Sequence, residues 1–229
     1  MMLDGIFGIA DKTALIIGDN PIAQVTLALF TQAGATVELI DVAPEEAAMA
    51  DAYAGFVERH GRLDIVVYAA SRIGTYALPE MTLAQWDVMH DINLRGAFIA
   101  LRDAVRQMKG QGGGVIVAVS TMGSLHPVLV GNTAYGSSKA GLNALVRATA
   151  LDHAGDGIRA NTVLHGAVPC GPPASDAVQL GGPAMQPGRL TLGMGQPEDV
   201  ASAILYLCSP AAKFITGQSL ALDGGFLIS

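Results

Sequence analysis

Tyr135 and Lys139 are the residues whose types and spacing are best suited to chemistry in this chain. They lie four residues apart within 133–154, a stretch of helical periodicity, so both side chains are expected on one face of a helix. An ammonium group beside a phenol stabilises the phenolate and lowers the pKa of the tyrosine toward working pH. The pair therefore predicts a general acid or base, with a surface helix pair as the alternative.

The stretch LIIGDNPIAQ, residues 15–24, is typical of a strand that passes through one glycine, Gly18, into a helix. Asn20 is a suitable N-cap for that helix, and Pro21 fits its first turn. Asp41 ends the next predicted strand at about the 20-residue spacing expected for an acid that binds the ribose hydroxyls of a dinucleotide. A carboxylate there repels a 2′-phosphate, which favours NAD over NADP. A turn-forming aspartate is the alternative.

Short strand-like runs alternate with longer stretches of helical period, which is typical of parallel strands joined by crossover helices. Most runs are apolar on both faces, as strands covered by helices on two sides must be. We expect strands at 13–18, 36–41, 63–71, 115–120, 158–166 and 219–225. We expect helices at 21–33, 44–60, 82–109, 133–154 and 197–208. The Gly- and Pro-rich segment of about 166–195 lacks such periodicity, which predicts a functional lid or a disordered loop.

Composition limits the classes of function open to the chain. Its 229 residues suit one α/β domain, so we expect a single domain over 1–229. The chain is 51% hydrophobic, but Gly, Pro or charged residues interrupt every apolar run before the roughly 20 residues that a membrane span needs. A net charge of −7 argues against a nucleic-acid partner and leaves small molecules as the expected ligands.

The two cysteines and the amino terminus bear on compartment. Cys170 and Cys208 are too far apart for zinc-type spacing, so we expect two thiols, with neither a disulfide nor a metal. The amino terminus lacks both a basic region and a small-residue cleavage site, so we expect no signal peptide and a cytoplasmic location.

Four further stretches, two before Tyr135 and two after Lys139, match the sequence pattern of a known family in the same order along the chain. DINLRGAF contains Asn93, VIVAVSTMG contains Ser120, and GQPEDVASAILYLCS is followed by ITGQSLALDGG. Together they resemble the short-chain dehydrogenase/reductase family over almost the whole chain. The resemblance implies a doubly wound Rossmann-like sheet and hydride transfer between a nicotinamide and a carbinol or carbonyl carbon.

The resemblance also implies roles for individual residues. Ser120 orients the substrate oxygen, Tyr135 donates or removes its proton, and Lys139 additionally holds the nicotinamide ribose. Asn93 holds a water that connects the proton relay to solvent. The implied cofactor-binding positions are Gly18, Asn20, Ile22, Asp41, Ala69, Ala70, Tyr135, Lys139 and Val168.

The phosphate-binding loop departs from the family pattern. The family has Thr-Gly-x-x-x-Gly-x-Gly, whereas this chain has IGDNPIA, which keeps only Gly18. Pro21 removes a backbone donor, and Asp19 brings negative charge to the helix end that a pyrophosphate would occupy. Both changes predict weakened phosphate binding; stabilisation of the helix start by Asp19 is the alternative.

A second departure is one of length. The interval between Asp41 and Leu63 has room for one helix, whereas the family fits a helix, a strand and a helix there. We therefore expect a six-stranded sheet without the family's third strand, in the order 2-1-4-5-6-7 by the family's labels. The acidic side chain of that strand, which contacts adenine, is then absent as well. YAAS (68–71) replaces the family's Asn-Asn-Ala-Gly, and His165 and Cys170 stand where it has Pro and often Thr. His165 is either structural or part of the active site.

The sequence thus predicts an NAD(H)-dependent oxidoreductase that interconverts a secondary alcohol and a ketone. The alternative is a non-catalytic subunit that binds no nucleotide and assembles with an active paralogue, which the altered loop would explain. The joint presence of Asn93, Ser120, Tyr135 and Lys139 favours the enzyme. The resemblance implies a homotetramer for it. An apolar, bulky or aromatic substrate, or plain packing, would explain a group of apolar residues: Met122, Leu125, Val128 and Leu129.

Overall fold

Six parallel strands form one sheet in the order β2-β1-β3-β4-β5-β6. The structure, a computed structural model, describes residues 4–171, 175–178 and 180–229. The strands are β1 (Thr13–Ile17), β2 (Thr36–Ile40), β3 (Ile65–Tyr68), β4 (Gly114–Thr121), β5 (Ile158–His165) and β6 (Ser219–Leu222). Residues 41–64, all of them described, contain one helix and no strand. The predicted sheet order and the missing third strand are therefore confirmed.

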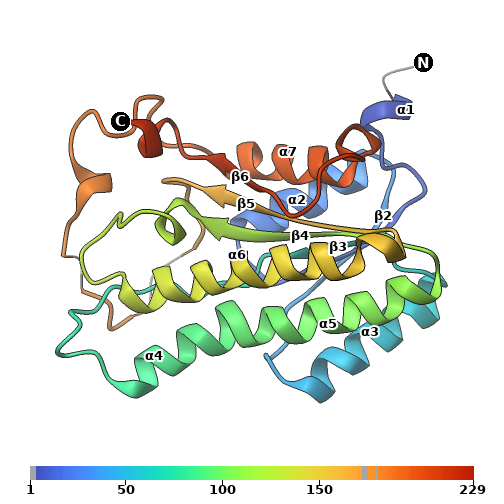
Figure 1. The fold of residues 1–229 in the computed structure, drawn as a ribbon, viewed down its shortest axis with the longest axis horizontal. Helices are drawn as coiled ribbons and strands as arrows, with labels where there is room; N and C mark the ends of the chain where they lie inside the picture. Colours follow the sequence, from blue (N-terminus) through green and yellow to red (C-terminus); the bar gives the residue numbers. More distant parts are fainter. Residues whose placement is uncertain (1–3, 172–174, 179) are drawn as a thin grey trace.

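Helices cover both faces of the sheet (Figure 1). One face carries α3 (Glu46–His60), α4 (Leu83–His90), α5 (Gly96–Gly110) and α6 (Thr133–His153), and the other carries α2 (Pro21–Gln32) and α7 (Pro197–Cys208). The shorter helical elements are α1 (Asp4–Phe7), η1 (Asp91–Arg95), η2 (Met122–Ser124), η3 (Ala154–Asp156), η4 (Pro183–Met185), η5 (Pro210–Ala212) and η6 (Phe226–Ile228). No helix in the described part of the chain is long and apolar enough to cross a membrane.

Alternation along the buried strands builds two apolar cores. Every residue of β1 and β3 is buried, as two-sided coverage requires. Leu15 and Ile116 belong to the core beneath α3, α5 and α6, whereas Ile16 and Val117 belong to the core beneath α2 and α7. Neighbouring strand residues thus point to opposite faces of the sheet.

The predicted helix at 82–109 is continuous but changes its winding. It begins at a capping box formed by Thr82 and Gln85, runs through α4, and passes through the π-helical turn η1 into α5. π-helical turns often mark functional sites, and Asn93 lies within this one.

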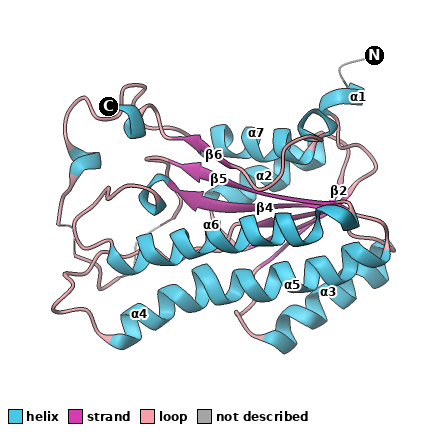
Figure 2. Ribbon diagram, in the orientation of Figure 1, coloured by secondary structure: helices cyan, strands magenta, loops and turns pink. Residues whose placement is uncertain are grey.

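The carboxyl ends of the strands define the functional edge of the sheet. The arrowheads of β4, β5 and β6 point toward the end of the molecule where the loops of segment 166–195 lie (Figure 2). The chain leaves β1 for β2 on one side and returns through α3 to β3 on the other, so the order of the strands reverses between β1 and β3. In open α/β sheets, ligands bind outside the carboxyl ends at such a switch point.

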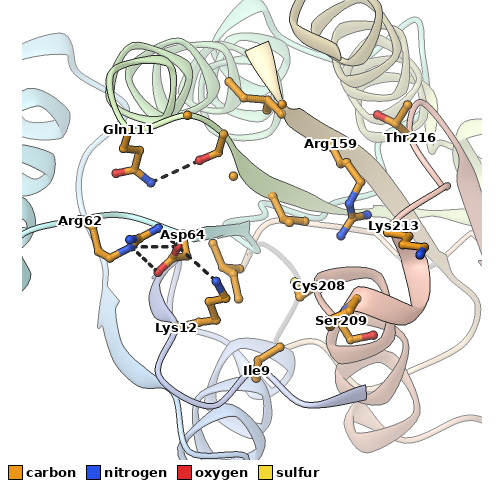
Figure 3. Close-up of a pocket in the computed structure, with 18 of the residues that line it drawn as sticks. Ile9, Lys12, Arg62, Asp64, Gln111, Arg159, Cys208, Ser209, Lys213 and Thr216 are labelled. Atoms are coloured by element: carbon orange, nitrogen blue, oxygen red, sulfur yellow. Dashed lines mark hydrogen bonds and ion pairs between the residues drawn. The ribbon is translucent and has the colours of Figure 1, made fainter. Parts of the chain in front are cut away.

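A cavity of about 900 Å³ opens at the opposite edge, near the amino ends of the strands (Figure 3). Arg62 and Lys12 pair there with Asp64 at 2.6 and 3.8 Å, and Arg159 donates to two backbone carbonyl oxygens. None of the predicted catalytic residues lines this cavity. The predicted active site therefore lies outside this cavity.

Candidate active site

Tyr135 and Lys139 lie one turn apart near the start of α6, and both are buried, with 2% and 1% of their surface exposed. Lys139 Nζ donates to the carbonyl oxygen of Val119 at 2.9 Å. The ammonium group is therefore held at the carboxyl end of β4, the edge where the switch point also lies.

Burial controls the pKa of both groups. It raises the pKa of Tyr135 well above its usual range and lowers the pKa of Lys139 to about 8. The sequence predicted a tyrosine pKa lowered by the neighbouring ammonium. In the structure, the loss of hydration outweighs any such effect, because it disfavours the charged form of each group.

Two hydroxyl groups approach the phenol, and neither belongs to Ser120. The hydroxyls of Ser71 and Thr121 lie near enough to the phenol to act to lower the pKa of Tyr135. Thr121 Oγ1 already accepts from the N–H of Gly123 at 3.2 Å, so its O–H remains available to donate. Thr121 is thus brought to the phenol by the structure, although the family pattern pointed to its neighbour.

Ser120 has a different environment. Its side chain is fully buried, and its Oγ has no hydrogen-bond partner among the described residues. The signal in the sequence that could have indicated Thr121 is the pair of adjacent hydroxyl residues at the strand end.

Asn93 connects the end of β3 to α6. Its Oδ1 accepts from the N–H of Arg72 at 2.8 Å, and its Nδ2 donates to the Arg72 carbonyl at 2.9 Å and to Ser138 Oγ at 3.0 Å. The amide therefore uses each of its polar atoms to position the chain that follows β3. The predicted role in holding a relay water stays a prediction.

An open groove of about 350 Å³ lies at the switch point. It extends past Gly18 and Asn20, past Asp41 after β2, and to Ala70 and Ser71 after β3. Gly18 has φ +110°, and a Cβ there would lie 2.4 Å from the Ala70 nitrogen, so only glycine is accommodated. Of the predicted cofactor positions, the groove is lined by Gly18, Asn20, Asp41 and Ala70.

Asn20 occupies the start of α2 with its own hydrogen bonds. Its Oδ1 accepts from the N–H of Ala23 at 3.0 Å, and its Nδ2 donates to the carbonyl of Ala69 at 2.7 Å. Pro21 has no N–H, so the N–H of Ile22 is the donor of the first helical turn that is left for a ligand. The predicted weakening of phosphate binding thus has a visible cause.

Besides Tyr135 and Lys139, three predicted cofactor positions lie outside the groove lining. The Ile22 side chain is buried in the core beneath α2, and the Ala69 carbonyl is engaged by Asn20. Val168 lines a separate cavity of about 360 Å³ with Gly195 and Asp199. Of these three residues, Ile22 can still contribute a backbone N–H, because it lies in the first turn of α2.

Residues 175–178 lie beside the buried cluster that contains Tyr135. Asp176 accepts from the hydroxyl of Tyr76 at 2.7 Å and from Gln85 Nε2 at 2.8 Å. Ala177 packs against the buried cluster that contains Tyr76 and Tyr135. This part of segment 166–195 is therefore held next to the candidate catalytic residues. Residues 172–174 and 179 of that segment lie outside the described residues.

His165 and Cys170 lie near Lys139, whose charge acts to lower the pKa of each of them. His165 pairs with Thr121 across β4 and β5, and its Nδ1–H donates to the carbonyl of Gly166 at 2.9 Å. Burial and the charge of Lys139 lower the pKa of His165 to about 4. Burial raises the pKa of the Cys170 thiol. The sequence left the role of His165 open, and the structure places it beside the candidate catalytic residues.

The residues present fit a nicotinamide dinucleotide, with one deficiency. Asp41 is exposed at the groove, where a carboxylate can accept from ribose hydroxyls. Ser71 lines the groove and also reaches the phenol, so the groove leads to Tyr135. The deficiency is at the start of α2, which has a single N–H donor left for a pyrophosphate. Fold and site together define an α/β protein of the dinucleotide-binding class.

Comparisons with known proteins agree with this class. A family sequence model described as Enoyl-(Acyl carrier protein) reductase matches residues 13–227. The L-rhamnose 1-dehydrogenase (NAD(P)(+)) of Sphingomonas sp. (strain SKA58) is 34% identical over 194 residues, which cover 82% of this chain and 74% of that protein. A 3-oxoacyl-(acyl-carrier-protein) reductase of Thermotoga maritima is 30% identical over 244 aligned positions, which cover 95% and 98% of the two chains.

Solved structures with the same fold also match almost the whole chain. A dehydrogenase/reductase from Sinorhizobium meliloti 1021 superposes with a TM-score of 0.87 at 27% identity, covering 97% of each chain. A 7α-hydroxysteroid dehydrogenase in complex with NADH and 7-oxo glycochenodeoxycholic acid superposes with a TM-score of 0.83 at 25% identity, covering 98% of each chain. The chain belongs to the short-chain dehydrogenase/reductase family, a family of oxidoreductases.

Proposed function

We propose that this chain is an NAD(H)-dependent oxidoreductase that interconverts a secondary alcohol and a ketone. The observation that carries the proposal is Ser71, which lines the open groove and also reaches the buried phenol of Tyr135. One path therefore joins the site suited to a dinucleotide with the group suited to move a proton. The comparisons support the class of reaction through relatives that are dehydrogenases and reductases.

In this mechanism, Tyr135 removes the hydroxyl proton of the alcohol or returns it to the ketone oxygen. Thr121 takes the substrate-orienting role that the family pattern assigned to Ser120, because its O–H lies near the phenol at the end of β4 and is free to donate. Lys139, with its pKa near 8, is largely protonated at neutral pH and provides the cation on the same helix. The nicotinamide, when bound, supplies the hydride acceptor or donor.

The preference for NAD over NADP rests on Asp41. This carboxylate is exposed at the groove after β2, where an adenosine ribose would bring its 2′ position. A 2′-phosphate would meet the like charge of Asp41 there.

Access and assembly complete the proposal. Segment 166–195 acts as a lid; in its support, Asp176 binds Tyr76 and Gln85, and Ala177 packs against the cluster that contains Tyr135. We propose a homotetramer on the resemblance to the family, with the outer faces of α5 and α6 as contact surfaces. Phe98 on α5 and Leu151 on α6 are exposed apolar side chains that support this assignment.

Turnover tests the proposal directly. Purified protein is assayed for reduction of NAD by a panel of secondary alcohols that includes bulky apolar members. Tyr135→Phe should lower kcat/KM by about 10²- to 10⁴-fold, because it removes the proton acceptor, while the unfolding midpoint changes little. Tyr206→Phe is the matched control, because Tyr206 lies on α7 away from the groove. Full activity in Tyr135→Phe would refute the assigned proton acceptor.

A further inference from the structure

The groove lacks the positive surroundings that a pyrophosphate needs. Its lining includes two carboxylates, Asp19 and Asp41, and a single basic residue, Arg72. The start of α2 offers only the N–H of Ile22, because Asn20 uses the next donor and Pro21 has none. If a dinucleotide binds here, its two phosphate charges require a cation from elsewhere in the groove.

Arg72 is placed and held for that task. It follows Ser71 at the end of β3, and Asn93 fixes both polar groups of its backbone, the N–H at 2.8 Å and the carbonyl at 2.9 Å. Its side chain is exposed, so the guanidinium has not lost its hydration to the protein core. The backbone of Arg72 is therefore held in place, while its guanidinium is exposed and can contact a ligand.

The guanidinium of Arg72 has no close partner within the described residues. None of the ion pairs between these residues involves it. Its charge nevertheless acts to lower the pKa of Asp176 and of Tyr76, two residues that are hydrogen-bonded to each other. Arg72 therefore lies between the groove and the candidate lid.

We propose that Arg72 binds the pyrophosphate of the dinucleotide and so replaces the backbone donors that the shortened loop has lost. The proposal rests on the proposed function, in which the groove binds a nicotinamide dinucleotide. Arginine suits this role because its planar guanidinium donates two parallel hydrogen bonds to phosphate oxygens.

ADP-ribose and adenosine separate the phosphate contribution from the rest of the groove. ADP-ribose binding is measured by calorimetry, and adenosine binding by displacement of NADH fluorescence. Arg72→Gln should weaken ADP-ribose binding by roughly 10- to 100-fold, the range for lost hydrogen bonds to a charged group, and leave adenosine binding within about twofold. Arg72→Lys should give an intermediate loss, because the charge remains but the paired donors do not.

Arg147→Gln is the control for a general change in charge. Arg147 is exposed on α6 and does not line the groove, so this variant should bind ADP-ribose like the parent protein. Affinity for ADP-ribose should also fall more steeply with added salt in the parent protein than in Arg72→Gln.

The possible failures are distinguishable. Equal ADP-ribose affinity in the parent protein and Arg72→Gln would overturn the inference alone. An equal loss of adenosine affinity would overturn it too, because Arg72 would then shape the groove rather than bind phosphate. Absence of saturable binding of NADH and ADP-ribose to the parent protein would overturn both the inference and the proposed function.

Discussion

The phenol of Tyr135 has neighbours from the loop after β3 and from the end of β4, in addition to its own helix. Only some of these neighbours can be predicted from the sequence. Tyr135 and Lys139 are predictable, because helix periodicity places residues four apart on one face. The choice between Ser120 and Thr121 is not predictable from the family pattern, because it depends on where the end of β4 places each hydroxyl. The contact of Ser71 is also hidden, since the sequence shows it only as a replacement for glycine.

The two hydroxyl residues at the end of β4 yield a paired prediction. Thr121→Val should lower kcat/KM by about 10²-fold or more, because the substrate oxygen loses its orienting donor. Ser120→Ala should leave kcat/KM within about threefold and leave the free energy of unfolding unchanged or higher, because an unpartnered buried hydroxyl is removed. Steady-state kinetics and denaturant unfolding of both variants check this. The reverse pattern of activity would return the role to Ser120.

His165 predicts how stability depends on pH. Its pKa is about 4 in the folded protein and about 6.5 when unfolded, so the unfolded state binds more protons between these values. The stability that it contributes is present above pH 6.5 and is lost as the pH falls toward 4, by up to about 3 kcal/mol. His165→Asn keeps a donor for Gly166 and should lose less stability over this range. Parallel unfolding titrations that show identical pH dependence would contradict this prediction.

At the scale of elements, the start of α2 illustrates how a loop that lost its glycines remains ordered. Asn20 links the helix to β3 through its bonds to Ala23 and Ala69. The capping role was predictable from residue type. The bond to Ala69 was not, because it depends on how closely β1 and β3 approach after the strands end.

Removal of that cap should destabilise the protein. Asn20→Ala is expected to lower the free energy of unfolding by about 1–2 kcal/mol, because α2 loses its cap and the Ala69 carbonyl loses a donor. Asp19→Ala serves as the control, since Asp19 is exposed and should change stability by no more than about 0.5 kcal/mol. Denaturant unfolding measures both values, and an unchanged Asn20→Ala would show that the cap contributes nothing to stability.

Element boundaries were predictable where periodicity or length determined them. The helix at 82–109 was expected, but the π-helical turn that carries Asn93 has no marker in DINLR. The strand expected at 63–71 ends at Tyr68, because the next three residues leave the sheet and two of them line the groove. Strand propensity alone could not separate a strand from the loop that follows it.

At the scale of the whole molecule, the missing third strand followed from chain length, because 41–64 has room for a single helix, and the order of the other six followed from the family resemblance. The packing of residues 175–178 beside the Tyr135 cluster could not be predicted, since it depends on contacts between segments about 100 residues apart. Burial of the phenol is why the tyrosine pKa is raised rather than lowered. Two carboxylates, Asp19 and Asp41, line the groove, so binding of the negatively charged cofactor is the step that most needs a test.

A titration of the purified protein with NADH and with NADPH, followed by nicotinamide fluorescence, tests the central claim most directly. We predict saturable NADH binding that is tighter than NADPH binding by about tenfold or more, because a 2′-phosphate would approach Asp41. Asp41→Asn should narrow that difference. Absence of saturable binding at millimolar concentrations of either nucleotide would contradict the account and favour a subunit that binds no cofactor.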